Sequence, residues 1–560
     1  MHVLESFIFL FCLILFIISF LESGLQDLTY YFLYTTLSFL SFFIVLFKKP
    51  GEKKVTLELL FFLAVYLLIM LSSLFSVDPN VTRIASNQVF SAVLLFFTFS
   101  NLSFEKRQQL VKSLIAASTF LAVLGIIQTL TGSGGFRSGG GIARAHSVFV
   151  TPNTFAGFCA VFLILSLYFF FSERKKERVL LYGLSAFILT GGIVCSFSRS
   201  VVLLFVPMTV FVFTKLLCSF QRSELVKAYF KKRITSVFLL IAGCGVIFIL
   251  AAFLGDSEYV KERLMSYLRP HRASSLHARM LYWRSAWGMI KDFFPCGSGY
   301  STFATIYPWY KDPSFQGVTH FFAHNDAIQF LSELGPLGLF ALLFFWAWAF
   351  VKTYRSNGFS SACGFALLFL IFFSVFEYVF YLPTFLFIMV LFFAVMTLVE
   401  KQREHLMMER IVRIVLIGAV LTNVIFLARL FSAEKEVKRA RKRLEKPQPS
   451  EHAWGSALED MREAEKMMPK SVSYKLNSFR IMAVLYENFQ RKDLAEALEK
   501  KFDDISALAP YHKKAVDAAY VFFARHQKDR QSFYRYYLKV QKLIQERSRA
   551  GRSLSSEENE

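Results

Sequence analysis

Long apolar runs constrain this sequence more than any other feature. A helix needs roughly 20 apolar residues to cross a bilayer, and about twelve or thirteen runs of that length follow one another along the chain. They predict an all-α, polytopic membrane protein. The predicted spans cover approximately residues 3–21, 28–47, 56–76, 88–104, 113–131, 154–172, 179–197, 200–217, 234–255, 335–352, 360–381, 383–399 and 411–431.

The composition agrees with a membrane protein. Of the 560 residues, 55% are hydrophobic and 67 are phenylalanine, and the mean hydropathy of +0.45 is far above that of soluble domains. The first apolar run lacks the basic segment of a secretory signal, so we predict that it is retained as the first span. The seven cysteines are scattered without a CxxC pair, a pattern that argues against disulfides and against a metal site.

The formal net charge of +22 is explained by basic clusters between the apolar runs. Basic loops mark the cytoplasmic side of a membrane protein, whereas no stacking-aromatic or nucleic-acid motif accompanies these clusters. We therefore predict no nucleic-acid binding and a cytoplasmic N-terminus. The clusters lie at residues 48–54, 106–112, 174–178, 227–233 and 401–413.

Two regions differ from the apolar spans. A long, basic loop at about 256–325 lies on the side opposite the basic clusters, where only long loops tolerate such charge. Residues 432–545 are charged and predicted to be helical, and an odd number of spans places them outside the cytoplasm. Their repeated Ala-Leu-Glu openings, at 457 and 497, fit either a TPR-like repeat or an ordinary helical bundle. Residues 546–560 are predicted to be disordered.

Arg199 lies in the stretch "SFSRS", at the external mouth of two spans that almost no loop separates. Hydroxyl groups and a guanidinium at a membrane boundary suit a phosphate, which arginine can grip with two hydrogen bonds at any pH. The alternative is an arginine that only reaches up to lipid headgroups. Arg199 is therefore a candidate anion ligand.

Within the long loop, apolar residues between 276 and 290 recur with helical spacing and predict an amphipathic helix on the membrane surface. Arg272 and Arg279 are seven residues apart and share a face of this helix, where they could bind a ligand or simply meet headgroups. The following "PCGSGY" is a glycine turn that could bring backbone close to a ligand.

The stretch "HFFAHNDAIQFLSELGPLG", residues 320–338, carries the titratable groups nearest to a span. His320 and His324 have the spacing of a helical zinc pair, but HExxH is absent and no third ligand is evident, so we predict no metal site. Asn325 instead has the character of an N-cap, with a helix that ends at Gly335-Pro336. His324 would then precede a helix N-terminus, which favours a neutral imidazole and a bound anion, the combination that a general base beside a phosphate needs.

Taken together, these motifs resemble the O-antigen ligase superfamily, which includes O-antigen ligases, O-antigen polymerases and protein O-oligosaccharyltransferases. The resemblance covers roughly residues 55–400. It rests on "SFSRS" after a mid-chain span, an arginine-bearing helix that leads into "PCGSGY", and "HNDAIQFLSELGPLG" opening the next span; "TPNTFAGF" at 151–158 also resembles a family segment.

The resemblance implies a GT-C-like fold and glycan transfer from an undecaprenyl-diphosphate donor on the periplasmic side of the bacterial inner membrane, without a metal or other cofactor. By matching motif, Arg199 and Arg279 would bind and stabilise the departing diphosphate, and His324 would be the catalytic histidine. A direct displacement would invert the anomeric centre, whereas a double displacement would need Asp326 or Glu333 as nucleophile. Additional candidates for binding the diphosphate or the glycan are Arg144, Arg272, Asn325 and Glu333, although Glu333 also fits a structural role.

The sequence thus predicts a membrane domain at 1–431, with its periplasmic catalytic loop at about 256–325, and a periplasmic helical domain at 432–545. The predicted partners are the lipid-linked donor, membrane lipids and an acceptor, for which lipid A-core is preferred and a growing glycan or a protein is the alternative. Simple O-antigen ligases lack the C-terminal helical region, which could dock a protein partner. A transporter would instead carry charges near the bilayer midplane and repeat symmetry, and a scaffold would not need His324.

Overall fold

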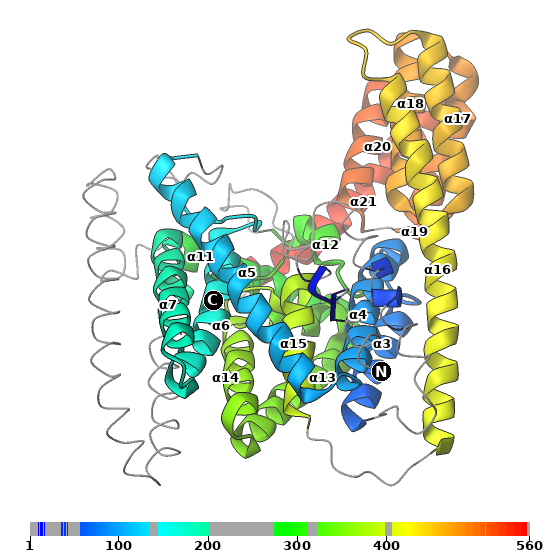
Figure 1. Cartoon of the computed structure of the whole chain (residues 1–560). Helices are drawn as coiled ribbons and strands as arrows, with labels where there is room; N and C mark the ends of the chain where they lie inside the picture. The colour runs from blue at the N-terminus through cyan, green and yellow to red at the C-terminus, as the bar shows by residue number, and fades with distance from the viewer. Residues whose placement is uncertain are drawn as a thin grey trace.

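A computed structural model shows how the helices are arranged (Figure 1). It describes residues 9–10, 12–14, 16, 35–36, 38–40, 42, 56–133, 144–201, 274–311, 322–397, 406–509 and 511–556. Within these ranges the regular elements are all helices, with no β-strand, which confirms the all-α class. The predicted spans at 200–217 and 234–255 lie almost entirely outside the described residues, as do most of those at 3–21 and 28–47.

The described helices confirm a multi-pass membrane protein. Six of them are long and apolar enough to cross a bilayer, and three more are apolar but shorter. The long ones are α4 (Pro79–Ser100), α5 (Phe104–Thr131), α6 (Pro152–Ser172), α7 (Lys176–Ser196), α13 (Asp326–Arg355) and α16 (Leu406–Arg443), and the short ones are α3 (Leu57–Ser72), α14 (Gly358–Phe373) and α15 (Pro383–Met396).

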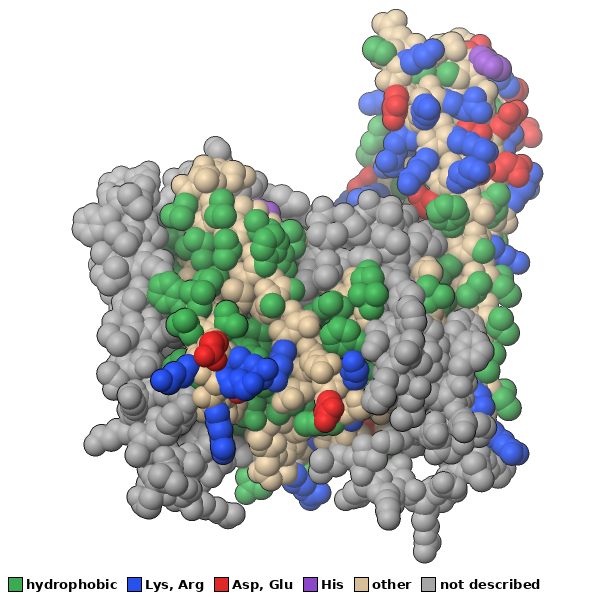
Figure 2. Space-filling model, viewed as in Figure 1, with side chains coloured by type: hydrophobic (Ala, Val, Ile, Leu, Met, Phe, Trp, Pro, Cys, Tyr) green, Lys and Arg blue, Asp and Glu red, His purple; other side chains and the backbone are tan. Residues whose placement is uncertain are grey.

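Successive spans run in opposite directions, so the connections gather at two ends of the block. One end holds short connections, including residues 173–175 between α6 and α7 and residues 356–357 between α13 and α14. Basic residues lie at this end, with Arg174 and Lys175 in the first connection and Lys352 and Arg355 in the last turn of α13. Figure 2 shows Lys and Arg side chains grouped at this end of an otherwise apolar surface. The opposite end holds residues 144–151, 197–201 and 374–382. Hydrogen-bonding N-caps start several helices on both sides, such as Asp78 for α4 and Thr151, with a full capping box, for α6.

The glycine turn of "PCGSGY" packs against a break in α13. Gly335 has φ 66° and ψ −163° inside α13, so the helix that starts at Asp326 bends at Gly335-Pro336 and continues to Arg355 rather than ending there. Ser298 N donates to Ser332 O at 3.1 Å, and Gly299 N donates to Glu333 O at 2.8 Å. A Cβ on Gly335 would collide with the carbonyl oxygen of Pro295. The turn therefore brings backbone close to another helix, and the glycines are needed for that approach.

The C-terminal helices form a separate bundle that stands above the end of the block with the longer connections (Figure 1). The single helix α16 runs from the membrane block into this bundle, across the predicted boundary at residue 432. Its partners are α17 (Glu451–Met467), α18 (Val472–Asn488), α19 (Ala495–Leu508), α20 (Lys513–His526) and α21 (Gln531–Ser556). The helix α21 thus extends into the segment 546–560 that the sequence predicts to be disordered.

Candidate active site

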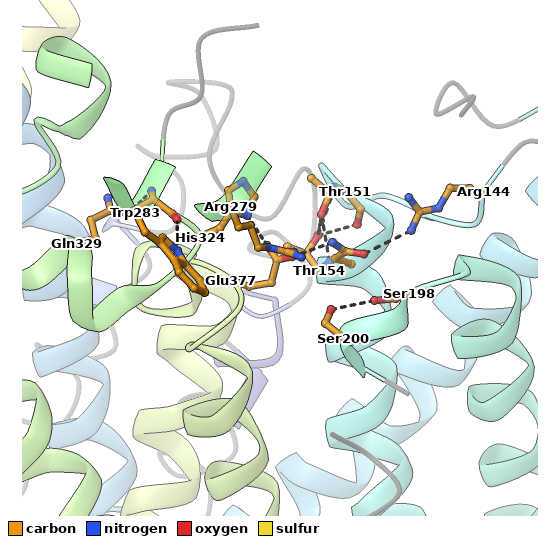
Figure 3. Close-up of polar contacts among 12 residues, drawn as sticks. Arg144, Thr151, Thr154, Ser198, Ser200, Arg279, Trp283, His324, Gln329 and Glu377 are labelled. Atoms are coloured by element: carbon orange, nitrogen blue, oxygen red, sulfur yellow. Dashed lines mark hydrogen bonds and ion pairs between the residues drawn. The ribbon is translucent and has the colours of Figure 1, made fainter. Parts of the chain in front are cut away.

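Four segments meet at the same end of the membrane block as the bundle, and they carry most of the polar side chains of Figure 3, in which Ser198 and Ser200 belong to the turn after α7. They are the helix α11 (Ser274–Phe293), the residues just before α13, the connection after α14, and the connection before α6. The prediction of a helix after residue 273 is confirmed. Its buried face includes Tyr282, Ala286 and Met289, whereas Met280 and Trp287, which the predicted apolar stripe includes, are exposed.

His324 is held in place by its neighbours on both sides. Asn325 caps α13, because its Oδ1 accepts a hydrogen bond from Ile328 N at 3.1 Å, and the predicted N-cap is thereby confirmed. His324 itself has φ 53°, a left-handed conformation that costs energy for a residue with a Cβ. Trp283 Nε1 on α11 donates to Ala323 O at 3.1 Å. The left-handed turn lets the chain enter α13 directly while the imidazole projects from its N-terminus.

Two tyrosines border the imidazole. The ring of Tyr282 stacks beside His324, with ring centroids 5.9 Å apart, and the ring of Tyr378 meets it edge to face at 5.1 Å. These contacts restrict rotation of the imidazole, so its two nitrogens point in defined directions.

Glu377 joins the two candidate catalytic residues. Its Oε1 accepts a hydrogen bond from Arg279 Nη2 at 2.7 Å, and its Oε2 lies 3.0 Å from His324 Nδ1. Asn153 Nδ2 donates to Oε1 at 2.8 Å. The Glu377 side chain is only 1% exposed, compared with 13% for Arg279 and 17% for His324. The carboxylate therefore lies beneath a guanidinium and an imidazole that both reach toward the surface of the site.

The partners of Glu377 keep it ionised. Burial alone would raise the pKa of this carboxyl group, but the charge and hydrogen bond of His324, together with Arg279 and Asn153, lower the pKa to about 2. Within the site Glu377 is thus a fixed anion, and it favours a proton on His324 Nδ1.

Arg144 extends the network toward α7. Its Nε donates to Ser196 O at 2.9 Å, and its Nη2 lies 3.4 Å from Asn153 Oδ1 and 3.5 Å from Phe197 O. Asn153 therefore connects Arg144 to Glu377. Arg199 is half-buried on the tight turn that follows, two residues after Phe197, which has φ 51°. The structure thus places Arg144, Arg279 and His324 in one network and Arg199 on the turn that binds Arg144.

The other predicted binding residues have different surroundings. The carboxylate of Glu333 is fully buried and accepts hydrogen bonds from Ser301 N, Phe303 N, Gln329 Nε2 and Tyr381 Oη, at 2.6 to 3.2 Å. These bonds hold the segment after "PCGSGY" against α13, which is the structural role that its position suggested. The Asn325 side chain acts as a helix cap. Arg272 and His320 lie outside the described residues.

Glu377 and Asn153 are the members of the network that sequence reasoning missed. Glu377 is a lone acid in "FFSVFEYVFYLP", inside the predicted span 360–381, and a charge within such an apolar stretch is a signal of function. Asn153 belongs to "TPNTFAGF", a segment that resembles the family but by itself indicates no role for this residue. Within the described part of the chain, no group of three His, Cys, Asp or Glu residues is arranged to hold a metal ion.

Comparison with known proteins finds a family match in the middle of the chain. A family model described as O-antigen ligase matches residues 184–343, so the resemblance to the O-antigen ligase superfamily is confirmed and the chain carries a domain of this ligase or polymerase type, whose members are glycosyltransferase-like enzymes. The matched segment includes Arg199, Arg279 and His324, whereas Arg144, Asn153 and Glu377 lie outside it. No curated protein matches the chain.

Proposed function

We propose that this protein is an inner-membrane glycosyltransferase that moves a polysaccharide from undecaprenyl diphosphate to an acceptor, lipid A-core, on the periplasmic side. One observation carries the proposal: Glu377 binds Arg279 and His324 at the same time, 2.7 Å and 3.0 Å away. A general base and a cation for the leaving group are thereby held side by side, at the end of a membrane block where a lipid-linked donor can place its diphosphate.

His324 is the general base in this proposal. A proton on Nδ1, donated to Glu377, leaves the lone pair on Nε2, which accepts the proton of the attacking hydroxyl group. The fixed carboxylate then stabilises the imidazolium that forms. Glu377 stays ionised through ordinary pH, so it can stabilise the imidazolium without first losing a proton itself.

Arg279 is the principal ligand of the diphosphate. Its Nη2 donates to Glu377 Oε1, and its buried Nε makes no hydrogen bond within the described residues. A guanidinium has five N–H donors, so Arg279 can hold both Glu377 and a phosphate oxygen. Negative charge grows on the diphosphate as its bond to the sugar breaks, and a fixed cation is most useful for such growing charge. Arg144 and Arg199 supply further positive charge, and Arg272 remains an additional candidate.

The surroundings of the carboxylates favour a direct displacement. The candidate nucleophiles Asp326 and Glu333 are both fully buried. Asp326 Oδ2 accepts a hydrogen bond from Phe380 N, and Glu333 is engaged by four donors. A nucleophile must reach the anomeric carbon, so neither group suits a covalent intermediate. The acceptor hydroxyl group then attacks the sugar directly and inverts its configuration.

A polysaccharide polymerase or a protein O-oligosaccharyltransferase would use the same base and cation, with a different acceptor. The transporter alternative fits less well, because the charged network lies at the ends of the spans rather than at mid-membrane. The basic residues at the other end of the block support the proposed orientation, because the positive-inside rule assigns them to the cytoplasm.

The test is transfer by purified protein in detergent, with lipid-linked glycan as donor and lipid A-core, a peptide or free glycan as acceptor. Replacing His324 with Ala should lower kcat by about 10²- to 10⁴-fold, and a chelator should leave the wild-type rate unchanged. The proposal fails if the His324→Ala protein transfers glycan normally, and the acceptor that is used separates ligase from polymerase and protein glycosylation.

A further inference from the structure

The C-terminal bundle lies against the membrane domain at two places. Helix α21 contacts α11 and the helix at Phe303–Tyr310, and a small aromatic joint is formed by Phe293, Trp309, Tyr511 and Lys513. The ring of Tyr511, between α19 and α20, meets the ring of Phe293 edge to face at 4.9 Å. Trp309 Nε1 donates to Tyr511 O at 2.6 Å, and Lys513 Nζ lies 4.9 Å from the centroid of the Trp309 ring. Both an oriented hydrogen bond and ring packing therefore connect the bundle to this region.

The joint lies at one end of the helix that carries Arg279. Phe293 is the last residue of α11, and Trp309 belongs to α12 (Phe303–Tyr310). Tyr310 Oη on α12 donates to Asp292 Oδ2 on α11 at 2.6 Å, so the ends of these two helices are fastened to each other. The contacts of Trp309 with the bundle therefore hold both α12 and the end of α11.

The other end of α11 lies in the candidate active site. Arg279 binds Glu377, and Trp283 binds the carbonyl group of Ala323, next to His324. Residues 279 and 293 are separated by about 21 Å of helix, at 1.5 Å per residue. A helix of this length moves as a rigid body, so a tilt at Phe293 displaces the guanidinium of Arg279 relative to the imidazole of His324.

We propose that the C-terminal bundle positions Arg279 for glycan transfer, with Tyr511 as the positioning residue that acts through α11. This inference rests on the role of Arg279 in the proposed function. The bundle does not touch the reacting atoms through this joint. The bundle fixes the far end of α11, and α11 in turn sets the position of the Arg279 guanidinium relative to Glu377. A misplacement of about 1 Å in such a site can cost about 100-fold in rate.

The test compares Tyr511→Ala with Tyr511→Phe. Both variants keep the backbone carbonyl group that accepts the hydrogen bond from Trp309. The alanine variant removes the ring that meets Phe293, whereas the phenylalanine variant keeps that ring. Tyr534→Ala is the matched control, because Tyr534 lies on α21 in the same bundle and is 47% exposed. We expect Tyr511→Ala to lower kcat about tenfold or more with a change in the donor KM below about threefold. Tyr511→Phe and Tyr534→Ala should remain close to the wild-type protein.

Hydrogen exchange of the full-length protein gives a readout that does not depend on activity. In Tyr511→Ala, amides of residues 274–293 should exchange faster, while those of α6, which is buried in the membrane block, should be unchanged. If Tyr511→Ala proves poorly folded by this α6 criterion, Trp309→Phe replaces it. This variant removes the indole hydrogen bond to Tyr511 O, keeps a smaller aromatic ring near Lys513, and should give the same pattern more weakly.

The outcomes separate the two proposals. Unchanged exchange in α11, or an unchanged kcat despite faster exchange, overturns the positioning role of Tyr511. Equal loss of activity in Tyr534→Ala does so too, since the effect would then belong to the bundle as a whole. If wild-type protein transfers no glycan to any acceptor, the proposed function fails, and the exchange of α11 alone decides whether the joint holds this helix.

Discussion

At Glu377 a single buried carboxylate binds both Arg279 and His324. Arg279 uses Oε1 and His324 uses Oε2, so a side chain with one acceptor oxygen cannot keep both bonds. Asn153 adds a third contact and links the carboxylate to Arg144. The chemistry of the site thus depends on a residue that does not itself meet the substrate in the proposed mechanism.

Replacing Glu377 with Gln should therefore lower kcat by roughly 10²-fold or more, close to the contribution of a positioned general base. The amide keeps the size of the side chain but removes the charge that stabilises a protonated imidazole, and its NH₂ group faces one of the two donors. Glu377→Asp is the control, because it retains the charge with a shorter reach and should lose less activity. Steady-state kinetics in detergent would measure both. A glutamine variant with wild-type kcat would contradict the role given to this carboxylate.

The same residue predicts a dependence of stability on pH. The pKa of Glu377 is lowered from its ordinary 4.5 to about 2 in the folded protein. The ionised form is therefore favoured by folding, so its contribution to stability is fully present above about pH 4.5 and is lost as the pH falls toward 2. The difference in Tm between wild-type protein and Glu377→Gln should be largest near pH 6 and should shrink at pH 3. Thermal unfolding in detergent would test this, and a pH-independent difference would oppose it.

Among the elements, the break in α13 shows how a glycine can shape a site from a distance. Gly335 combines a left-handed backbone with a close approach to Pro295 O, and the turn that follows Pro295 is bonded to Glu333 and Ser332. This turn connects α11 to α12. The geometry of the break therefore sets where the arginine-bearing helix ends.

Gly335→Ala should destabilise the protein by more than about 1–2 kcal/mol, since a left-handed alanine costs that much and the new Cβ meets backbone atoms that cannot move aside. Gly418→Ala is a matched control within α16, where nothing lies within 4 Å of the added Cβ. Alanine should be neutral there or stabilise the helix by about 0.5–1 kcal/mol. Thermal unfolding of both variants would measure the contrast, and equal effects would show that the close approach at Gly335 carries no cost.

At the scale of the whole molecule, some features could be predicted from local sequence and others could not. The presence of apolar spans and the N-cap at Asn325 depend on neighbouring residues, and both are visible in the sequence, whereas α13 and α16 extend well beyond the predicted spans 335–352 and 411–431. Glu377 could not be assigned, because its partners Arg279, His324 and Asn153 are 98, 53 and 224 residues away. The joint at Tyr511 likewise depends on residues about 200 positions apart. Long-range pairings of this kind depend on helix packing that a local pattern does not encode.

The orientation of the whole chain can be tested at Cys296. This thiol is exposed in the turn after α11, at the end of the block that holds the candidate site, whereas the other described cysteines, Cys12, Cys159, Cys195 and Cys363, are buried. If that end is periplasmic, a membrane-impermeant maleimide should label the protein in intact spheroplasts, and Cys296→Ser should abolish most of the labelling. Cys218 and Cys244 lie outside the described residues. The labelling that remains in the Cys296→Ser variant measures how much these two cysteines contribute. Labelling of Cys296 only after the membrane is broken would place the candidate site in the cytoplasm, and a periplasmic transfer reaction would then be impossible for this protein.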